Sequence, residues 1–213
     1  MYDLPHHKEK DPAGILEFIR QHPFAMVIGV DADHQPAVTQ VPMLVKERDG
    51  KLFLQAHVMR QTHHHKAFEH QPRVLAVFTG PHTYVSASWY VNKQIGSTWN
   101  YQAVHARGQL RFLESDQLLQ LLKELTAHFE NDAASPSLYE HLPAEYVQRM
   151  SKAIVGFEIE VTNIEHVYKL SQDRDEQSYQ NIVDHLSAGD ASARYIAEEM
   201  RKRKQSVFPE QNR

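Results

Sequence analysis

Short apolar segments separated by turn-forming residues dominate the first half of the chain. Apolar runs cover Phe24–Val30 and residues 37–45 and 51–58. Between them lie residues 31–36 and 47–50, which contain the aspartate, proline and glycine that favour tight turns. The pattern predicts three consecutive antiparallel strands joined by two hairpin turns.

Further strands are predicted downstream. The clearest covers residues 153–168, because four of its apolar side chains alternate onto one face. Gly80-Pro81 is expected to end a strand, and Gly108 to interrupt another. The remaining predicted strands cover residues 74–78, 84–86 and 101–113.

Helical periodicity is strongest in Ser115–Glu130, where leucines recur every three or four residues. An earlier helix should begin at Asp11-Pro12, a capping carboxylate followed by proline, and end before Pro23. The other predicted helices cover residues 61–70, 143–152, 174–186 and 190–204, and residues 89–98 are predicted as a loop.

This order of elements favours an α+β fold. Six or seven antiparallel strands form the core, with helices inserted late and appended at the end. Meandering strands with a crossing helix indicate a closed or split β-barrel rather than a doubly wound sheet. We expect residues 1–170 to form the barrel and residues 171–213 a helical tail packed on it.

Composition narrows the possible functions. The 213 residues carry 23 basic and 27 acidic side chains, a net charge of −4, and no cysteine. Disulfides, thiolate metal sites and cysteine nucleophiles are therefore excluded. No apolar run approaches the ~18 residues of a membrane span, so we expect a soluble, cytoplasmic protein that does not enter a membrane.

Mild acidity argues against a general electrostatic surface for nucleic acid. One basic run, residues 201–204, could contact DNA phosphates, although a solvated helix end is the commoner role of such a run. No helix-turn-helix pattern precedes it. DNA binding is thus possible but has no motif to support it.

The segment at 80–101 has a composition that core packing does not easily explain. It brings both tryptophans of the chain, three tyrosines and several hydroxyl side chains into 22 residues. Such a mixture suits a flat ligand rich in heteroatoms, which needs both stacking faces and hydrogen bonds at its edges. The alternative is that these aromatics cap the barrel mouth or fill a dimer interface.

These same residues resemble the PaiB family of FMN-binding negative transcriptional regulators, and the likeness covers essentially the whole chain. Further matches are Lys-Leu-Ser-Gln-Asp-Arg at 169–174, Ile-Val-Gly-Phe at 154–157 and the opening Met1-Tyr2 with Pro5. The chain departs from the family pattern at Gln40, Thr62-His63, Ala87 and Ser97. The matching residues of the aromatic segment are Gly80, Pro81, Tyr84, Ser86, Ser88, Trp89, Tyr90, Lys93, Thr98, Trp99, Asn100, Tyr101, Val104, His105 and Gly108.

The resemblance implies a homodimer with FMN bound at the subunit interface. By that likeness Arg60 is the first candidate to grip the phosphate, since a guanidinium can bind it bidentately. Trp89, Trp99 and their neighbours would surround the flavin ring, and the 169–174 segment would contact the ring or a substrate. The full set of implied cofactor-binding residues is His57, Arg60, Gln61, Thr62, Lys66, Ser86, Trp89, Tyr90, Lys93, Thr98, Trp99, Asn100, Lys169, Ser171, Gln172 and Arg174.

Three consecutive histidines, His63 to His65, raise the question of a metal. Consecutive helical residues point about 100° apart, so the three cannot ligate one ion from a regular helix. No metal site is predicted. Partly protonated imidazoles beside an anionic phosphate are the favoured interpretation.

Three functions remain open at this stage. The family likeness favours a regulator. Related flavin barrels favour an oxidoreductase acting on a small substrate or a nicotinamide cofactor, with the chemistry residing in the flavin. The many histidines leave a haem-binding relative as a third possibility. No nucleophile elbow or paired-carboxylate spacing indicates a hydrolase.

Overall fold

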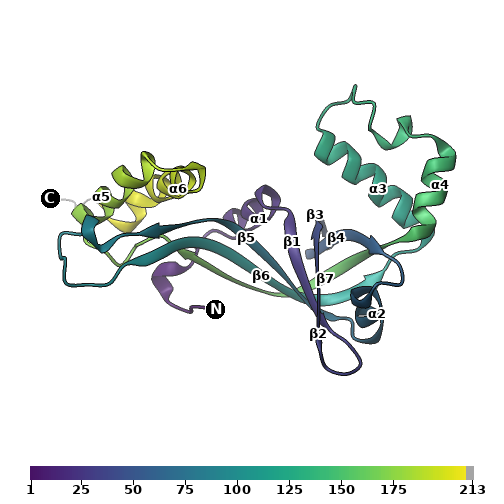
Figure 1. The fold of residues 1–213 in the computed structure, drawn as a ribbon, viewed down its shortest axis with the longest axis horizontal. Helices are drawn as coiled ribbons and strands as arrows, with labels where there is room; N and C mark the ends of the chain where they lie inside the picture. The colour runs from purple at the N-terminus through teal and green to yellow at the C-terminus, as the bar shows by residue number, and fades with distance from the viewer. Residues whose placement is uncertain (210–213) are drawn as a thin grey trace. The chain divides into compact units, whose positions relative to one another are not determined.

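The computed structural model describes residues 1–209 and contains one seven-stranded sheet (Figure 1). Its strand order is β2-β1-β5-β6-β7-β4-β3, and the pairs β1–β2, β1–β5, β3–β4 and β4–β7 run antiparallel. The predicted α+β split-barrel class is confirmed. The strands are β1 (Phe24–Val30), β2 (Pro36–Pro42), β3 (Leu44–Arg48), β4 (Lys51–Met59), β5 (Arg73–Val85), β6 (Thr98–Phe112) and β7 (Ile154–Lys169).

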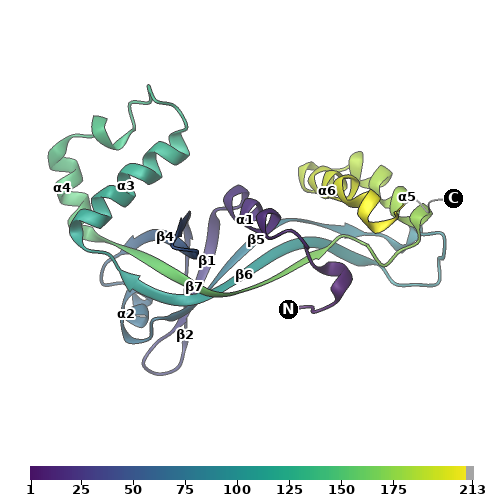
Figure 2. The ribbon, with the colours of Figure 1, turned by 180° about the vertical axis from the view of Figure 1, so that it is seen from behind.

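Helices account for most of the remaining chain, and the predicted helix Ser115–Glu130 is confirmed at both ends. Figures 1 and 2 show α5 and α6 side by side, and α3 near α4. The helices are α1 (Pro12–Gln21), α2 (His63–His70), α3 (Ser115–Glu130), α4 (Ala144–Ala153), α5 (Glu176–Ser187) and α6 (Ala191–Val207), with short 3-10 turns η1 (Pro5–His7), η2 (Ala87–Trp89) and η3 (Tyr139–His141).

The chain divides into two compact units, and each is described by itself. Unit 1 comprises residues 1–18, 79–104 and 165–213, of which residues up to 209 are described. Unit 2 comprises residues 19–78 and 105–164. Among residues 1–209, no helix combines the length and the apolar character that crossing a bilayer requires.

The prediction of one continuous strand over residues 37–45 was wrong. The chain breaks at Met43, so that β2 and β3 lie at opposite edges of the sheet. Pro42 is the last residue of β2, and the Met43 N–H still donates to the Pro23 carbonyl at 2.9 Å, so the chain leaves β1 only after Met43. Hydrophobic pattern alone does not reveal such a corner.

Two predicted interruptions were also wrong, because β5 runs through Gly80-Pro81 and β6 through Gly108. β1 pairs with β5 only at residues 75–77, so β1 needs no hydrogen bond from Pro81. Gly108 instead allows β6 and β7 to lie close together. A Cβ there would lie 2.3 Å from the Glu160 carbonyl oxygen and 2.5 Å from the Ile159 Cγ2.

The interior of unit 2 contains a buried carboxylate, Glu158, on β7. Its side chain is 2% exposed and accepts hydrogen bonds from Arg48 (2.7 and 2.9 Å), Arg111 (2.8 Å) and Gln55 (2.9 Å). Burial by itself would raise the pKa of Glu158, but these three donors outweigh it and the pKa is lowered. The carboxylate is therefore ionised and ties β3, β4, β6 and β7 together.

We expect Glu158→Gln to destabilise the protein by ~2–3 kcal/mol. The loss stays below that of a fully buried ion pair because Arg48 and Arg111 are each about half exposed. The depressed pKa adds a pH dependence. The stabilisation is present above the ordinary Glu pKa of 4.5 and disappears as the pH falls through the lower folded value.

Urea unfolding of both proteins between neutral and acidic pH measures this difference, which should shrink toward low pH. Glu160→Gln is the matched control, because within residues 1–209 Glu160 forms an ion pair only with the exposed Lys51, at 2.6 Å. This substitution should cost ~0–1 kcal/mol. Equal losses for the two variants would contradict the assignment.

In unit 1, the predicted basic run at 201–204 is paired with carboxylates. Arg203 is largely buried and bridges Glu9 (2.8 Å) and Glu199 (2.5 Å). The run therefore stabilises the packing of α6 rather than presenting four free charges to DNA. The other ion pairs of the run are Arg201–Glu198, Lys202–Glu199 and Lys204–Glu176.

Candidate functional site

The aromatic segment begins where β5 ends, in unit 1. Ser86 caps the turn η2, and its Oγ lies 2.8 Å from the Ser88 Oγ. The exposed Lys93 donates from Nζ to the Ser88 carbonyl at 2.5 Å. Ser97, which the sequence analysis did not select, accepts a hydrogen bond from the Ala87 N–H at 3.0 Å. The two ends of this loop are thus fastened by serine side chains.

Trp89 and Tyr90 are largely occupied within unit 1. The Trp89 indole is stacked on His185 of α5, with ring centroids 4.8 Å apart and planes 19° apart. Tyr90 is fully buried, and the Arg174 Cζ lies 4.9 Å from its ring centroid. Burial raises the pKa of Tyr90, which nearby Arg174 partly offsets. These two aromatics hold the loop against α5 and the 169–174 segment.

Trp99 differs from both. It lies on β6 with 53% of its surface exposed, beside Tyr84 of β5, which is 48% exposed. The two rings meet edge to face with centroids 5.9 Å apart, and the ring centroid of His82, also on β5, lies 6.0 Å from that of Trp99. We call His82, Tyr84 and Trp99 the aromatic patch. The sequence analysis did not select His82 and Tyr84 as cofactor contacts, although their alternation along a strand could have indicated them.

Asn100 and Ser171 form a buried pair. The Ser171 Oγ donates to the Asn100 Oδ1 at 2.9 Å, and the Asn100 Nδ2 lies 3.5 Å from the Met200 Sδ. Ser171 also has a left-handed backbone, with φ of 62°, which is uncommon for a residue other than glycine. Because the Asn100 amide accepts a hydrogen bond from Ser171 in the interior, we interpret it as a group that positions the 169–174 turn.

The other polar residues of that turn bond to nearby strands and to the turn itself. The Lys169 Nζ donates to the Thr98 Oγ1 at 2.7 Å and lies 5.5 Å from the Tyr2 ring. The Gln172 side chain accepts from the Leu170 N–H at 2.7 Å. Lys169 and Thr98 are each only partly buried, so this pair keeps a side open to solvent.

The predicted phosphate residues lie in unit 2, between β4 and α2. Gln61 has φ of 62°, and the Thr62 Oγ1 accepts from the His65 N–H as the N-terminal cap of α2. Arg60 and Lys66 are exposed and have no side-chain hydrogen bond or ion pair among residues 1–209. We call Arg60, Gln61, Thr62 and Lys66 the cap loop. It presents two unpaired cations at a helix N-terminus, which is the arrangement that binds anions.

The histidines near this loop have separate roles. His63 lies 2.9 Å from the Asp31 carboxylate through its Nε2, and His65 is buried against Phe112. His57, half-buried on β4, has its pKa lowered by burial and is neutral at pH 7. Within residues 1–209 no group of three or more potential ligands is arranged to hold a metal ion.

The structure thus sorts the sixteen predicted contacts into two sets. Those of the cap loop and His57 belong to unit 2, and those of the aromatic segment and the 169–174 turn belong to unit 1. Within unit 1 it brings Thr98 to Lys169, Asn100 to Ser171, and Tyr90 to Arg174. The 169–174 turn therefore contacts the aromatic segment within unit 1.

Residues 1–163 match the family described as "Putative FMN-binding domain". The chain is also 32% identical to the protease synthase and sporulation protein PAI 2 of Bacillus subtilis (strain 168), over 94% of this chain and 96% of the relative.

Two solved structures share the fold at low sequence identity. The flavocytochrome Anf3 from Azotobacter vinelandii gives a TM-score of 0.57 at 17% identity, over 75% of this chain and 68% of that one. The FAD and heme binding protein from Mycobacterium smegmatis gives 0.56 at 16% identity, over 76% and 72%.

Proposed function

Because the chain belongs to the FMN-binding domain family, with PAI 2 as a relative, we propose that it binds FMN. Two surfaces are candidates for contact with the cofactor, each described within its own unit: the cap loop in unit 2 and the aromatic patch in unit 1. The matching family is an FMN-binding one, so FMN is the cofactor, as the resemblance implied. The observation that carries the assignment of residues is the exposed edge-to-face pair of Trp99 and Tyr84. Exposed aromatic clusters of this kind indicate a ligand or partner surface.

The cap loop suits the phosphate end of FMN. A phosphate dianion needs charge-assisted donors, and Arg60 and Lys66 are free to supply them. The unpaired N–H groups at the start of α2 add partial positive charge. The Thr62 side chain is already used within the loop, because its Oγ1 accepts from the His65 N–H and donates to the Met59 carbonyl at 3.0 Å. Thr62 therefore shapes the cap loop, and the cations are left to bind the phosphate.

We expect Arg60→Ala to weaken FMN binding roughly tenfold or more, the value of a lost charge-assisted hydrogen bond. Titration of the apo protein with FMN, followed by flavin fluorescence at low and high salt, measures the change. Arg73→Ala is the matched control, since Arg73 is an exposed arginine of the same unit whose side chain, in the described part of the chain, bonds only to Gln71. An unchanged dissociation constant for Arg60→Ala would remove this residue from the site.

We also propose a homodimer with FMN at the subunit interface. Apolar side chains remain exposed in both units, among them Trp99 in unit 1 and Phe24, Met26 and Val38 on one face of β1 and β2 in unit 2. A second copy would bury such surface. Light scattering during size-exclusion chromatography tests this directly, and a monomer at micromolar concentration with FMN present would refute it.

The biological role that we propose is regulatory, on the strength of the relative PAI 2 and the family of negative regulators that the sequence resembles. A flavin oxidoreductase is the competing function. Incubation of FMN-loaded protein with NADPH separates the two, because reduction bleaches the flavin absorbance. Continued oxidation of NADPH would favour the enzyme. A flavin that NADPH does not reduce, together with binding of DNA by the protein, would favour the regulator.

A further inference from the structure

The first residues of the chain are attached to unit 1 by a single buried side chain. We call residues 1–8, which include the turn η1, the N-terminal arm. Within it residues 1–6 are exposed and Lys8 is half-buried, whereas His7 is only 4% exposed. The anchor of the arm is therefore an imidazole, a group that can gain a proton near neutral pH.

His7 is buried without a hydrogen bond. Neither of its ring nitrogens has a partner among residues 1–209. Within the arm, the His6 ring lies against it with centroids 4.2 Å apart. Two charged groups outside the arm also face it, Lys169 at the end of β7 and Asp173, whose carboxylate is already paired with Arg174 at 3.3 Å. A protonated imidazole would therefore be buried with no acceptor to bind its added proton.

A second histidine holds the base of the arm to β7. The His166 Nε2 accepts a hydrogen bond from the Glu9 N–H at 2.9 Å, and only an unprotonated nitrogen can accept one. The Glu9 carbonyl oxygen lies 3.2 Å from the same nitrogen, so protonation would exchange one bond for another and add none. The Glu9 carboxylate also pairs with Arg203 of α6 at 2.8 Å, a contact that involves no histidine.

The packing beneath the arm is incomplete. A cavity of about 460 Å³ lies there, lined by Pro5, His6 and Lys8 of the arm together with Tyr168 of β7 and Arg203 of α6. A space of this size has few atoms in van der Waals contact across it. Little apolar burial therefore opposes detachment of the arm, and the histidine contacts carry more of its attachment.

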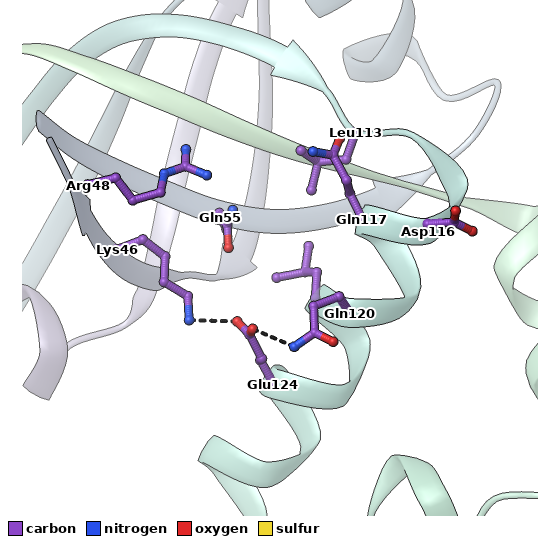
Figure 3. A pocket seen from close by; sticks show the side chains of 9 residues that line it. Lys46, Arg48, Gln55, Leu113, Asp116, Gln117, Gln120 and Glu124 are labelled. Carbon is purple, nitrogen blue, oxygen red and sulfur yellow. Dashed lines mark hydrogen bonds and ion pairs between the residues drawn. The ribbon is translucent and has the colours of Figure 1, made fainter.

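The pocket of unit 2 offers a contrast, because a different kind of group joins its walls. Figure 3 shows Glu124 of α3 bound to Lys46 of β3 at 2.6 Å and to Gln120 at 2.7 Å. Burial by itself would raise the pKa of Glu124, but Gln120 and Lys46 outweigh it and the pKa is lowered. This ion pair survives a fall in pH that protonates imidazoles.

We propose that the N-terminal arm is a pH-sensitive device, attached to unit 1 at neutral pH and released in mild acid when His7 and His166 gain protons. Release changes the surroundings of Lys169, whose Nζ lies 5.5 Å from the Tyr2 ring while the arm is attached. Lys169 begins the 169–174 turn, which the family likeness places near the flavin. The arm thus connects the pH of the solution to the environment of that turn.

The direction of the pH dependence follows from burial. Burial lowers the pKa of His7 from its ordinary value of 6.5, assisted by His6 and opposed by Asp173. Burial also lowers the pKa of His166, assisted by Lys8. The released arm therefore binds protons more readily than the attached arm. Attachment is complete above about pH 6.5 and weakens as the pH falls through the lower values of the attached state.

The test uses a nitroxide spin label on the arm of the full-length protein. The chain has no cysteine, so Leu4→Cys introduces a single labelling site, at a side chain that is 44% exposed. Electron paramagnetic resonance at about pH 7.5 and about pH 5 measures the immobile and mobile fractions of the label. We expect the ratio of attached to released arm to fall roughly tenfold or more at the lower pH. Circular dichroism of the same samples verifies that the protein remains folded.

Three variants identify the groups that titrate. His7→Phe keeps an aromatic ring at the anchor but cannot gain a proton, so its arm should stay attached at both pH values. In His166→Gln the amide oxygen can still accept the Glu9 N–H without titrating, so the response to pH should be smaller. His70→Gln is the matched control, because His70 is an exposed histidine of unit 2, and it should respond as the parent protein does.

A label with the same mobility at both pH values in the parent protein would overturn the proposal. So would equal responses to pH in the parent protein, His7→Phe and His166→Gln. The measurement requires no flavin, so neither outcome affects the FMN assignment.

Discussion

Replacing Trp99 with alanine should weaken FMN binding by roughly ten- to a hundredfold, the value of about 1–3 kcal/mol for stacking an aromatic ring on a heterocycle. More than half of the indole surface is exposed, so the substitution leaves no cavity. The melting temperature of the apo protein should therefore change by no more than about 2 °C. Quenching of flavin fluorescence during titration measures the affinity.

Phe129→Ala is the matched control for Trp99→Ala. Phe129 is a comparably exposed aromatic, at 46%, and it lies on α3 in unit 2. Its loss should leave FMN affinity unchanged. If Trp99→Ala instead weakens only self-association, and FMN binds normally once the protein is concentrated enough to be dimeric, the aromatic patch is a dimer contact and not a flavin contact.

Gly108→Ala should give the largest loss of stability of any single substitution considered, ~3 kcal/mol or more, because the new Cβ would collide with the β7 backbone. The nearest atom is the Glu160 carbonyl oxygen at 2.3 Å, and a backbone atom cannot move aside as a side chain end can. Strands β6 and β7 would have to move apart where Gly108 approaches Glu160, within unit 2. We expect the melting temperature to fall by roughly 10 °C.

Gly96→Ala provides the comparison for Gly108→Ala. Gly96 lies in the exposed loop before β6, and a Cβ added to it would meet no atom within 4 Å. Alanine there should be neutral or stabilising by up to ~1 kcal/mol, since it reduces the freedom of the unfolded chain. Similar melting temperatures for the two variants would show that β6 and β7 can separate at little cost.

The sequence of the aromatic segment predicts some properties of the site but not which of its aromatic side chains are exposed. Its composition indicated a flat ligand, and family likeness supplied FMN, but neither could separate Trp89 from Trp99. The two tryptophans are ten positions apart in the same segment. Trp89 is stacked on His185, which α5 supplies from 96 residues further along, whereas no helix stacks on Trp99 in this way among residues 1–209. Exposure is a tertiary property and has no local signature.

The surroundings of Asn100 and of the histidines at 63–65 are likewise set by residues distant in the sequence. Asn100 is fully buried in the structure, where its amide meets Ser171 and Met200. His63 pairs with Asp31 from a hairpin turn 32 residues earlier. The sequence predicted both to lie near the cofactor, but their partners in the structure come from distant parts of the chain and decide what each group can do.

The sequence by itself determined the elements whose signals are local, namely the helix α3, the strand β7 and the capped start of α1, because these depend on neighbours within a few residues. Only the tertiary structure decided the break at Met43, the passage of β5 through Gly80-Pro81, and the need for glycine at 108. It also decided the charge balance around Glu158, since Arg48, Gln55 and Arg111 reach that carboxylate from three different strands. Long-range pairing sets these features, and no window of sequence contains both partners.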